Sequence, residues 1–394
     1  MDMLTSLAYL FLLGLALGGL ARRLRLPPLL GMLLTGILLG PQVLNLLSGS
    51  LLSISADLRQ LALIIILTQA GLSLDVGDLR KAGRSALLMC FVPASFEIVG
   101  VVVLAPLLLK VTVAEASVMG AVLAAVSPAV VVPRMLRLMD ERYGAEHQIP
   151  QIIMAGASAD DVYVIVLFTA FTGLVQGEGF SAAALAAVPL SILTGILGGA
   201  AAGLLLASFF TRVHIRDSGK VLIFLSLSFL LVAAERALQG LFPFSGLLAV
   251  MAAGMALSRR RKDLSARLAA KFSKLWVAAE VLLFVLVGAT VDLRYAVSAG
   301  VAAVAVLLGA LAFRMAGVLF CMLGSRLAWK ERLFCMLAYL PKATVQAAIG
   351  GVPLSMGLSC GNLVLTVAVL SILITAPLGA ALIDRSYQRL LTRT

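Results

Sequence analysis

The sequence predicts an all-α polytopic membrane protein with about thirteen transmembrane helices, built as an inverted repeat with two proline-broken crossing helices. The first observation is composition: of 394 residues, 61% are hydrophobic and 13% charged, and the mean hydropathy is +1.08. The second is a succession of apolar runs of about 20 residues, the length that a bilayer-spanning helix needs. The third is a set of landmarks that recur at a nearly fixed offset along the chain. Together they exclude a soluble domain, and the net charge of +12 therefore indicates membrane topology and not a nucleic-acid partner.

The predicted spans follow from cutting the chain at charged or Gly/Pro-rich breaks. They lie near residues 3–21, 28–46, 56–74, 84–109, 114–138, 148–175, 181–210, 218–236, 241–258, 268–292, 295–323, 331–356 and 362–383. The first run lacks a basic start and a small-residue cleavage site, so we expect a retained helix and not a signal peptide.

The basic residues predict the direction of the spans. Most of the 31 Lys and Arg residues lie in the odd-numbered loops and the C-terminal tail. Only four lie in the even loops: Arg59, Lys110, Arg236 and Arg294. By the positive-inside rule the N-terminus is expected outside and the C-terminus in the cytoplasm. Arg314 and Lys342 fall inside spans and require another explanation.

An internal repeat connects the two halves. Gly71-Leu-Ser-Leu-Asp75 and Gly288-Ala-Thr-Val-Asp292 are 217 residues apart, as are Glu97 and Arg314, and Pro128 and Pro341 are 213 apart. The offset equals seven predicted helices, an odd number, so the two copies cross the membrane in opposite senses. Such inverted repeats are typical of secondary transporters.

Two spans carry a proline where a continuous helix would need an N–H group. The fifth contains Val126-Ser-Pro-Ala-Val-Val-Val-Pro133, and the twelfth contains Tyr339-Leu-Pro-Lys-Ala-Thr-Val-Gln346. Irregular backbone at membrane depth is tolerated where it is buried in protein or lines a cavity. We therefore predict helix breaks at Pro128 and Pro341, close to a common substrate site.

Ionisable residues inside spans are few, and each costs about 2.5–3.5 kcal/mol at a helix centre unless it has a partner or a function. Asp160 and Asp161 are adjacent in the sixth span. Two neighbouring carboxylates repel each other when both are ionised, so one requires a proton or a cation and the other a fixed positive partner. This chemistry suits the exchange of a monovalent cation for protons. We expect Lys342 to pair with one aspartate, and Arg314 to form a permanent ion pair with Glu97.

Other polar residues are assigned no role in the site. Glu280 fits a lipid-side or dimer contact as well as a functional one, and His147 and His214 are expected on the surface of cytoplasmic loops. The four cysteines have no CxxC spacing, so no disulfide framework, transition-metal site or cofactor is predicted.

The chain resembles the monovalent cation/proton antiporter superfamily, and within it the NHA branch of sodium/proton exchangers. The residues that carry the resemblance are Leu30–Pro41, Ser127–Pro133, Tyr143-Gly144, Ile149-Pro150, Gly156–Asp161 and Leu340–Gly350. The resemblance implies that Asp161 is the ion-binding aspartate, with Asp160 beside it. We add Ser127 and Ser158, from the same motifs, to the expected Na+ site.

The resemblance also implies the assembly and the transport mechanism. It suggests a homodimer in the plasma membrane of a bacterium, acting in pH homeostasis by an elevator movement. The chain is then one transporter unit, with scaffold helices near 1–75 and 218–292 and core helices near 84–175 and 295–383. The electrogenic bacterial members carry a lysine where this chain has Arg314, so we expect electroneutral exchange of Na+ or Li+ for protons.

Three other functional classes explain the sequence less well. An intramembrane aspartyl protease needs its two aspartates on different helices, and here they are adjacent, so we expect no enzyme. A passive cation channel has no need of a proline-broken inverted repeat or a buried lysine. A sodium-coupled symporter of an organic anion is the remaining alternative, and a dependence of transport on an organic substrate would favour it.

Overall fold

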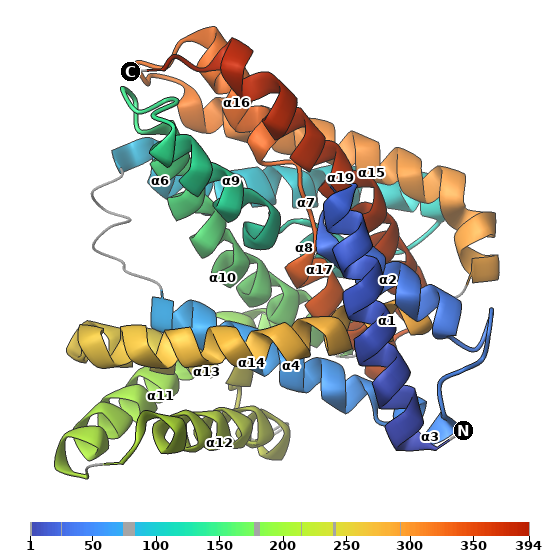
Figure 1. Cartoon of the computed structure of the whole chain (residues 1–394), viewed down its shortest axis with the longest axis vertical. Coiled ribbons are helices and arrows are strands. Elements are labelled where there is room, and N and C mark those ends of the chain that lie inside the picture. The colour runs from blue at the N-terminus through green and yellow to red at the C-terminus, as the bar shows by residue number, and fades with distance from the viewer. Residues whose placement is uncertain are drawn as a thin grey trace. The chain divides into compact units, whose positions relative to one another are not determined.

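The structure is a computed structural model that describes residues 2–24, 26–73, 83–176, 182–213, 215–238, 242–291 and 293–393. Within these ranges the regular structure is helical, with one isolated bridge between Tyr143 and Arg393. Asp75, His214 and Asp292 lie outside the described residues. The all-helical fold class is therefore confirmed for the described part of the chain (Figure 1).

Nine helices among the described residues are long and apolar enough to span a membrane. They are Met3–Arg23, Gly83–Leu109, Val113–Asp140, Ile149–Val175, Leu190–Arg212, Asp217–Ala237, Lys262–Ala289, Gly300–Met322 and Gly361–Leu390. The predicted number of about thirteen is not confirmed. Two of the other predicted spans form helices shorter than 18 residues, Pro28–Leu39 and Gly246–Arg260, because Gly40-Pro41 and Pro243 limit their length. Ser55–Ser73 has 19 residues but contains several polar ones.

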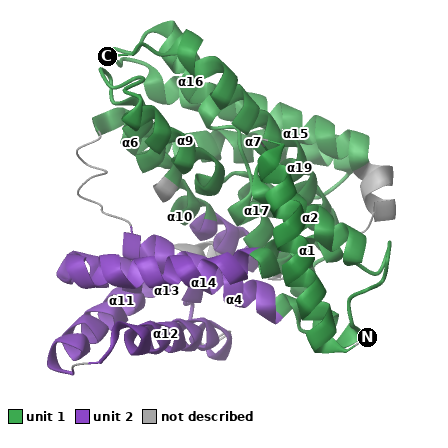
Figure 2. Cartoon of the chain, viewed as in Figure 1, with its two compact units in different colours: residues 1–56, 77–164, 281–394 green, residues 57–76, 165–280 purple. Residues whose placement is uncertain are grey.

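The chain divides into two compact units (Figure 2). Unit 1 contains residues 1–56, 77–164 and 281–394, and unit 2 contains residues 57–76 and 165–280. These units are defined by contacts alone. The division into scaffold and core expected from the resemblance stays a prediction about movement.

Unit 1 holds the landmarks Glu97, Pro128, Gly288, Arg314 and Pro341 of the predicted repeat, whereas Gly71 belongs to unit 2. Its helices are α1 (Met3–Arg23), α2 (Pro28–Leu39), α3 (Gly49–Ser53), α6 (Gly83–Met89), α7 (Val92–Leu109), α8 (Val113–Leu123), α9 (Pro128–Asp140), α15 (Leu293–Met322), α16 (Trp329–Ala338), α17 (Thr344–Ile349), α18 (Val352–Ser355) and α19 (Gly361–Leu390), with the first part of α10 (Ile149–Gln176) and the end of α14 (Lys262–Ala289).

Helices α7 and α15 pack closely, and small residues allow it. A Cβ atom at Gly100 would lie 2.9 Å from the Phe313 ring, and one at Gly317 would lie 2.9 Å from the Pro93 Cα. Glycines at such contacts let membrane helices approach each other without a hydrophobic driving force between them. The close approach brings Glu97 of α7 and Arg314 of α15 into the same buried layer.

Two pairs of helices in unit 1 are separated by short non-helical segments. Helix α8 ends at Leu123 and α9 begins at Pro128, and α16 ends at Ala338 and α17 begins at Thr344. Residues 124–127 and 339–343 therefore leave backbone groups that no helix satisfies. Below, these segments are called the first and second interrupted segments.

The helices that precede these segments begin in the same way. At the start of α8, Glu115 Oε2 accepts the Thr112 N–H at 2.9 Å, and at the start of α16, Glu331 Oε2 accepts the Ala328 N–H at 2.8 Å. Glu115 and Glu331 are 216 residues apart, which is the repeat offset to within one residue. A carboxylate in the first turn also interacts favourably with the helix dipole.

Each capping glutamate uses its other oxygen to hold a distant loop. Ser359 Oγ donates to Glu115 Oε1 at 2.6 Å, and His147 Nδ1 lies 2.9 Å from Glu331 Oε1. Ser359 lies in the loop between α18 and α19, and His147 lies in the loop between α9 and α10. Glu115 of the first predicted repeat is therefore bound to a loop of the second, and Glu331 of the second is bound to a loop of the first.

Unit 2 contains α4 (Ser55–Ser73), α11 (Ala182–Arg212), α12 (Asp217–Ala237), α13 (Gly246–Arg260) and most of α14. Glycines at every fourth position of α11 face α13, at Gly195, Gly199 and Gly203. A Cβ at Gly199 would lie 2.1 Å from the Ala249 carbonyl oxygen, so only glycine permits this packing.

All four cysteines, at positions 90, 321, 335 and 360, are buried and carry free thiols. Cys90, Cys321 and Cys335 lie in the hydrophobic core of unit 1 or beside it. They therefore pack as small apolar residues.

Candidate ion-binding site

The two interrupted segments meet directly. The Ser127 N–H donates to the Pro341 carbonyl at 2.8 Å, which is a backbone contact between the two predicted repeats. Pro128 occupies the first position of α9, where its missing N–H is not needed. Freed backbone groups of the two segments are thus satisfied partly by each other.

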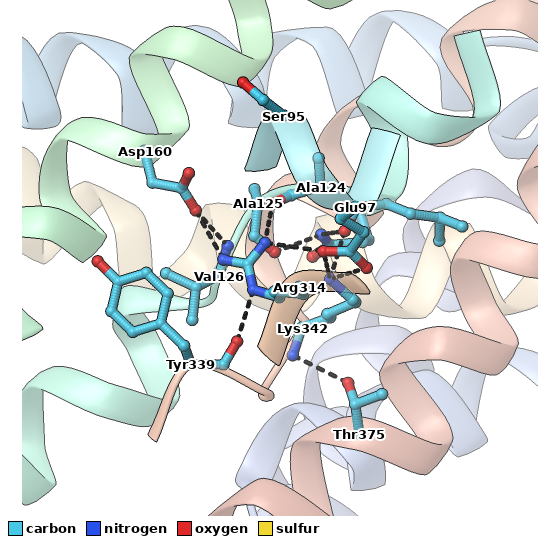
Figure 3. Close-up of polar contacts among 12 residues, drawn as sticks. Ser95, Glu97, Ala124, Ala125, Val126, Asp160, Arg314, Tyr339, Lys342 and Thr375 are labelled. Carbon is cyan, nitrogen blue, oxygen red and sulfur yellow. Dashed lines mark hydrogen bonds and ion pairs between the residues drawn. The ribbon is translucent and has the colours of Figure 1, made fainter. Parts of the chain in front are cut away.

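Arg314 connects the surrounding elements (Figure 3). Its Nε donates to the Tyr339 carbonyl at 2.7 Å, and its Nη1 donates to the Ala124 carbonyl, so it binds both interrupted segments. The same guanidinium contacts Glu97 through Nη1 at 2.8 Å and Asp160 through Nη2 at 3.0 Å. Arginine suits this position because its planar group presents several donors in fixed directions.

Glu97 binds two cations. Besides its contact with Arg314, its Oε1 and Oε2 lie 2.7 and 2.8 Å from Lys342 Nζ. Lys342 Nζ also donates to the Leu123 carbonyl at 2.5 Å, and the Lys342 N–H donates to Thr375 Oγ1 at 2.9 Å. The expected contact of Lys342 with an aspartate is therefore corrected: the described contacts place the ammonium on Glu97. The reason is that residues 339–343 are not helical, so the backbone carries Lys342 toward α7.

The two aspartates have different surroundings. Asp160 Oδ2 accepts from Arg314 and from the Val126 N–H at 2.9 Å, whereas its Oδ1 has no hydrogen-bond partner in the described part of the chain. Asp161 Oδ1 is buried and is likewise without a partner there. Adjacent residues point about 100° apart on a helix, so the two carboxylates present different faces of α10.

Arg314 and the three charged residues near it have balanced charges. Glu97, Asp160, Arg314 and Lys342 are all fully buried, and their formal charges sum to zero when all four are ionised. Buried charges are tolerated when each has a partner and hydrogen bonds. We call these four residues the charged quartet. Asp161 follows Asp160 in the chain, and its buried Oδ1 has no hydrogen-bond partner among the described residues.

The remaining predicted residues fall into two groups. Ser127 is buried in the first interrupted segment, and its Oγ has no hydrogen-bond partner among the residues described. Ser158 lies in α10, but its side chain is outside those that the structure describes.

Three contributors were missed from the sequence. They are the Tyr339 carbonyl, the Thr375 hydroxyl, and Gln346, whose Nε2 donates to the carbonyls of Ala125 at 2.9 Å and Leu123 at 3.2 Å. Gln346 lies in the motif that follows Pro341, and a buried amide four residues after Lys342 was the available signal.

Comparisons with known proteins identify similar sequences. The family described as "Sodium/hydrogen exchanger, transmembrane" matches residues 8–384. Sodium/hydrogen exchanger 9B2 of Homo sapiens is 35% identical, covering 98% of this chain and 74% of its own. The protein of that name from Mus musculus is 34% identical, covering 94% and 69%.

The fold also resembles solved structures. That of the sodium proton antiporter MjNhaP1 from Methanocaldococcus jannaschii at pH 8 matches with a TM-score of 0.83 and 20% identity, over 99% of both chains. A second structure of the same protein matches with a TM-score of 0.74 and 21% identity. At this identity the likeness concerns the fold.

Proposed function

Because the chain belongs to the transmembrane sodium/hydrogen exchanger family, we propose that it is a secondary active antiporter that exchanges Na+ or Li+ for protons. It is an integral membrane protein with nine candidate spans among its described residues. Its relatives are exchangers and not enzymes. The sodium-coupled symporter of an organic anion is not favoured by them.

The observation that carries this proposal is the contrast between the two aspartates. Asp160 is ion-paired within the neutral quartet, whereas the buried Oδ1 of Asp161 accepts no hydrogen bond from a described residue. A carboxylate in such a place is neutralised by a proton or by a cation, and both cannot occupy it together. Competition at one carboxylate couples the two flows.

The cation site is proposed to use oxygen atoms that no described donor occupies. These are Asp161 Oδ1, Asp160 Oδ1 and Ser127 Oγ, with Ser158 expected from the sequence motif. Hard monovalent cations prefer such oxygen ligands. Na+ is the transported substrate here and not a resident cofactor.

Movement and assembly are further parts of the proposal. The core helices near 84–175 and 295–383 would move like an elevator against the scaffold, and two chains would form a homodimer. The charge asymmetry of the loops supports an outer N-terminus and a cytoplasmic C-terminus. The relatives reported above are mammalian, so the comparisons do not support the expected bacterial inner membrane.

The test is transport by the purified protein in proteoliposomes. A pH gradient is imposed, Na+, Li+ and K+ are added in turn, and internal pH is followed. Competition predicts that the apparent affinity for Na+ improves as pH rises, because the cation needs the deprotonated carboxylate. A proton movement that no alkali cation drives, or an affinity independent of pH, contradicts the proposal.

A further inference from the structure

The end of helix α8 is enclosed by side chains from the second repeat. A helix leaves its last carbonyls without intrahelical donors, and they carry the negative end of the helix dipole. Lys342 and Gln346 donate to the Leu123 carbonyl, Arg314 to that of Ala124, and Gln346 to that of Ala125. Three consecutive carbonyls at the first interrupted segment therefore each have a side-chain donor.

Gln346 differs from the other two donors. Arg314 and Lys342 are cations that also bind Glu97, so their positions depend on the charges of the quartet. Gln346 is neutral and fully buried, and one amide group serves both the Leu123 and the Ala125 carbonyls. Its two hydrogen bonds join an amide to backbone carbonyls and involve no ionisable group.

The occupied carbonyls are themselves good ligands for an alkali cation. Backbone carbonyl oxygens bind hard cations, and rings of them form cation sites in channels. At the end of α8 the dipole would strengthen such binding. Buried oxygens without a described donor include those of Ser127, Asp160 and Asp161, and also Gln346 Oε1 and Thr344 Oγ1.

We propose that Gln346 is a positioning residue of the exchanger: it occupies the Leu123 and Ala125 carbonyls and so confines the cation to the aspartates and sets its selectivity. This inference rests on the proposed exchange function. The residue acts through the interrupted backbone, and it needs its amide N–H groups to do so.

Two substitutions separate this role from a merely structural one. Gln346→Glu keeps the shape, but its ionised form has no donor and repels both carbonyls, whereas its protonated form can donate to one. Its exchange rate should therefore fall about tenfold relative to wild type at alkaline pH and recover toward acid pH. Gln346→Met removes both donors without a charge, so the ratio of the apparent KM values for Na+ and K+ should change while the pH profile keeps its shape.

The matched control is Gln151→Glu, in the first turn of α10, where the glutamine oxygen is also buried without a described donor. Its pH profile and KM ratio should equal those of wild type. If Gln346→Glu does not fold, as judged by gel filtration in detergent, the KM ratio of Gln346→Met decides alone.

The outcomes are distinct. Lower yield or maximal rate with an unchanged pH profile and KM ratio would make Gln346 structural only and overturn the inference. The proposed function itself fails only if wild type and Gln151→Glu also show no cation-driven proton movement in the same vesicles.

Discussion

Glu97 is the residue whose two oxygens join the positive charges of the site. It contacts both Arg314 and Lys342, and Arg314 in turn contacts Asp160. The sequence predicts a pair, and the structure contains a chain of four charges. Removing one member therefore affects the balance of three others.

This chain predicts an unequal pattern in double mutants. Glu97→Gln leaves Lys342, and Arg314→Met leaves Asp160, as a buried charge without its ion-pair partner, so each should lower the free energy of unfolding by about 3–5 kcal/mol. Lys342→Met should cost less, because Glu97 keeps its contact with Arg314. The double mutant Glu97→Gln with Lys342→Met should lose less free energy of unfolding than the two single mutants together, because the contact between Arg314 and Asp160 remains. Thermal unfolding in detergent measures both quantities.

The complementary double mutant is the control. Glu97→Gln with Arg314→Met leaves both Lys342 and Asp160 without an ion-pair partner, and the two do not form an ion pair with each other in the structure, so the double mutant should show little or no recovery. Equal recovery in the two double mutants would mean that the four charges do not act as a chain.

A second prediction concerns the aspartates. Asp161→Asn should reduce cation-driven proton movement to the background of empty vesicles, because an amide keeps the shape but exchanges no proton. Asp160→Asn loses a charge-assisted contact with Arg314 and should slow exchange about tenfold without abolishing it. Exchange rates at equal protein content in proteoliposomes compare the two.

Of the contacts in the site, the pair of Glu97 and Arg314 could be predicted from the sequence, whereas those of Lys342 and Gln346 could not. The offset of 217 residues predicts the pair of Glu97 and Arg314, and the two helices that carry these residues, α7 and α15, pack closely. The partner of Lys342 could not be obtained in this way, because it depends on the path of the non-helical residues 339–343. Gln346 was missed for the same reason, since its partners are backbone carbonyls, which carry no sequence signal.

At the scale of elements, α8 and α16 make contacts at their first turns as well as at the interrupted segments that follow them. Glu115 binds the loop before α19 through Ser359, and Glu331 binds the loop before α10 through His147. Each glutamate also caps its own helix. The first turns of α8 and α16 are thus each bound to a loop of the other predicted repeat.

Coupling between Glu331 and His147 should be measurable. In a double-mutant cycle with Glu331→Gln and His147→Ala, we expect a coupling free energy of about 0.5–1.5 kcal/mol, because Glu331 is buried and water competes little for this hydrogen bond. The exposed i,i+4 pair Arg137 and Glu141 provides the control, with about 0.3–0.5 kcal/mol. A coupling no larger than that of the control would show that the contact does not fasten the loop.

Helix lengths were harder to predict than helix positions. Pro128 and Pro341 lie in or beside the interrupted segments, because the missing N–H is a local property of the sequence. The length of an apolar run is not the length of its helix, as at α2, which ends at Leu39 before Gly40-Pro41 although the predicted span continues to residue 46. Apolar patterning therefore overestimates the number of full spans among the described residues.

At the scale of the whole molecule, the inverted arrangement can be tested by labelling. All four native cysteines are buried, so a membrane-impermeant maleimide should leave the native protein unlabelled. Ser359→Cys should react only from outside intact, oriented vesicles, and Glu146→Cys, beside His147, only from inside. Labelling of both from one side would contradict the opposite orientation of the two repeats.

The neutral quartet has a thermodynamic consequence. If its four members keep their charges, the site carries the same charge with a proton on Asp161 as with a sodium ion there. The membrane voltage then does no work on a complete exchange. Transport stops when the sodium ratio across the membrane equals the proton ratio, so a pH difference of about one unit balances a tenfold sodium gradient. Vesicles held at different potentials but loaded with the same sodium gradient should therefore settle at one common internal pH.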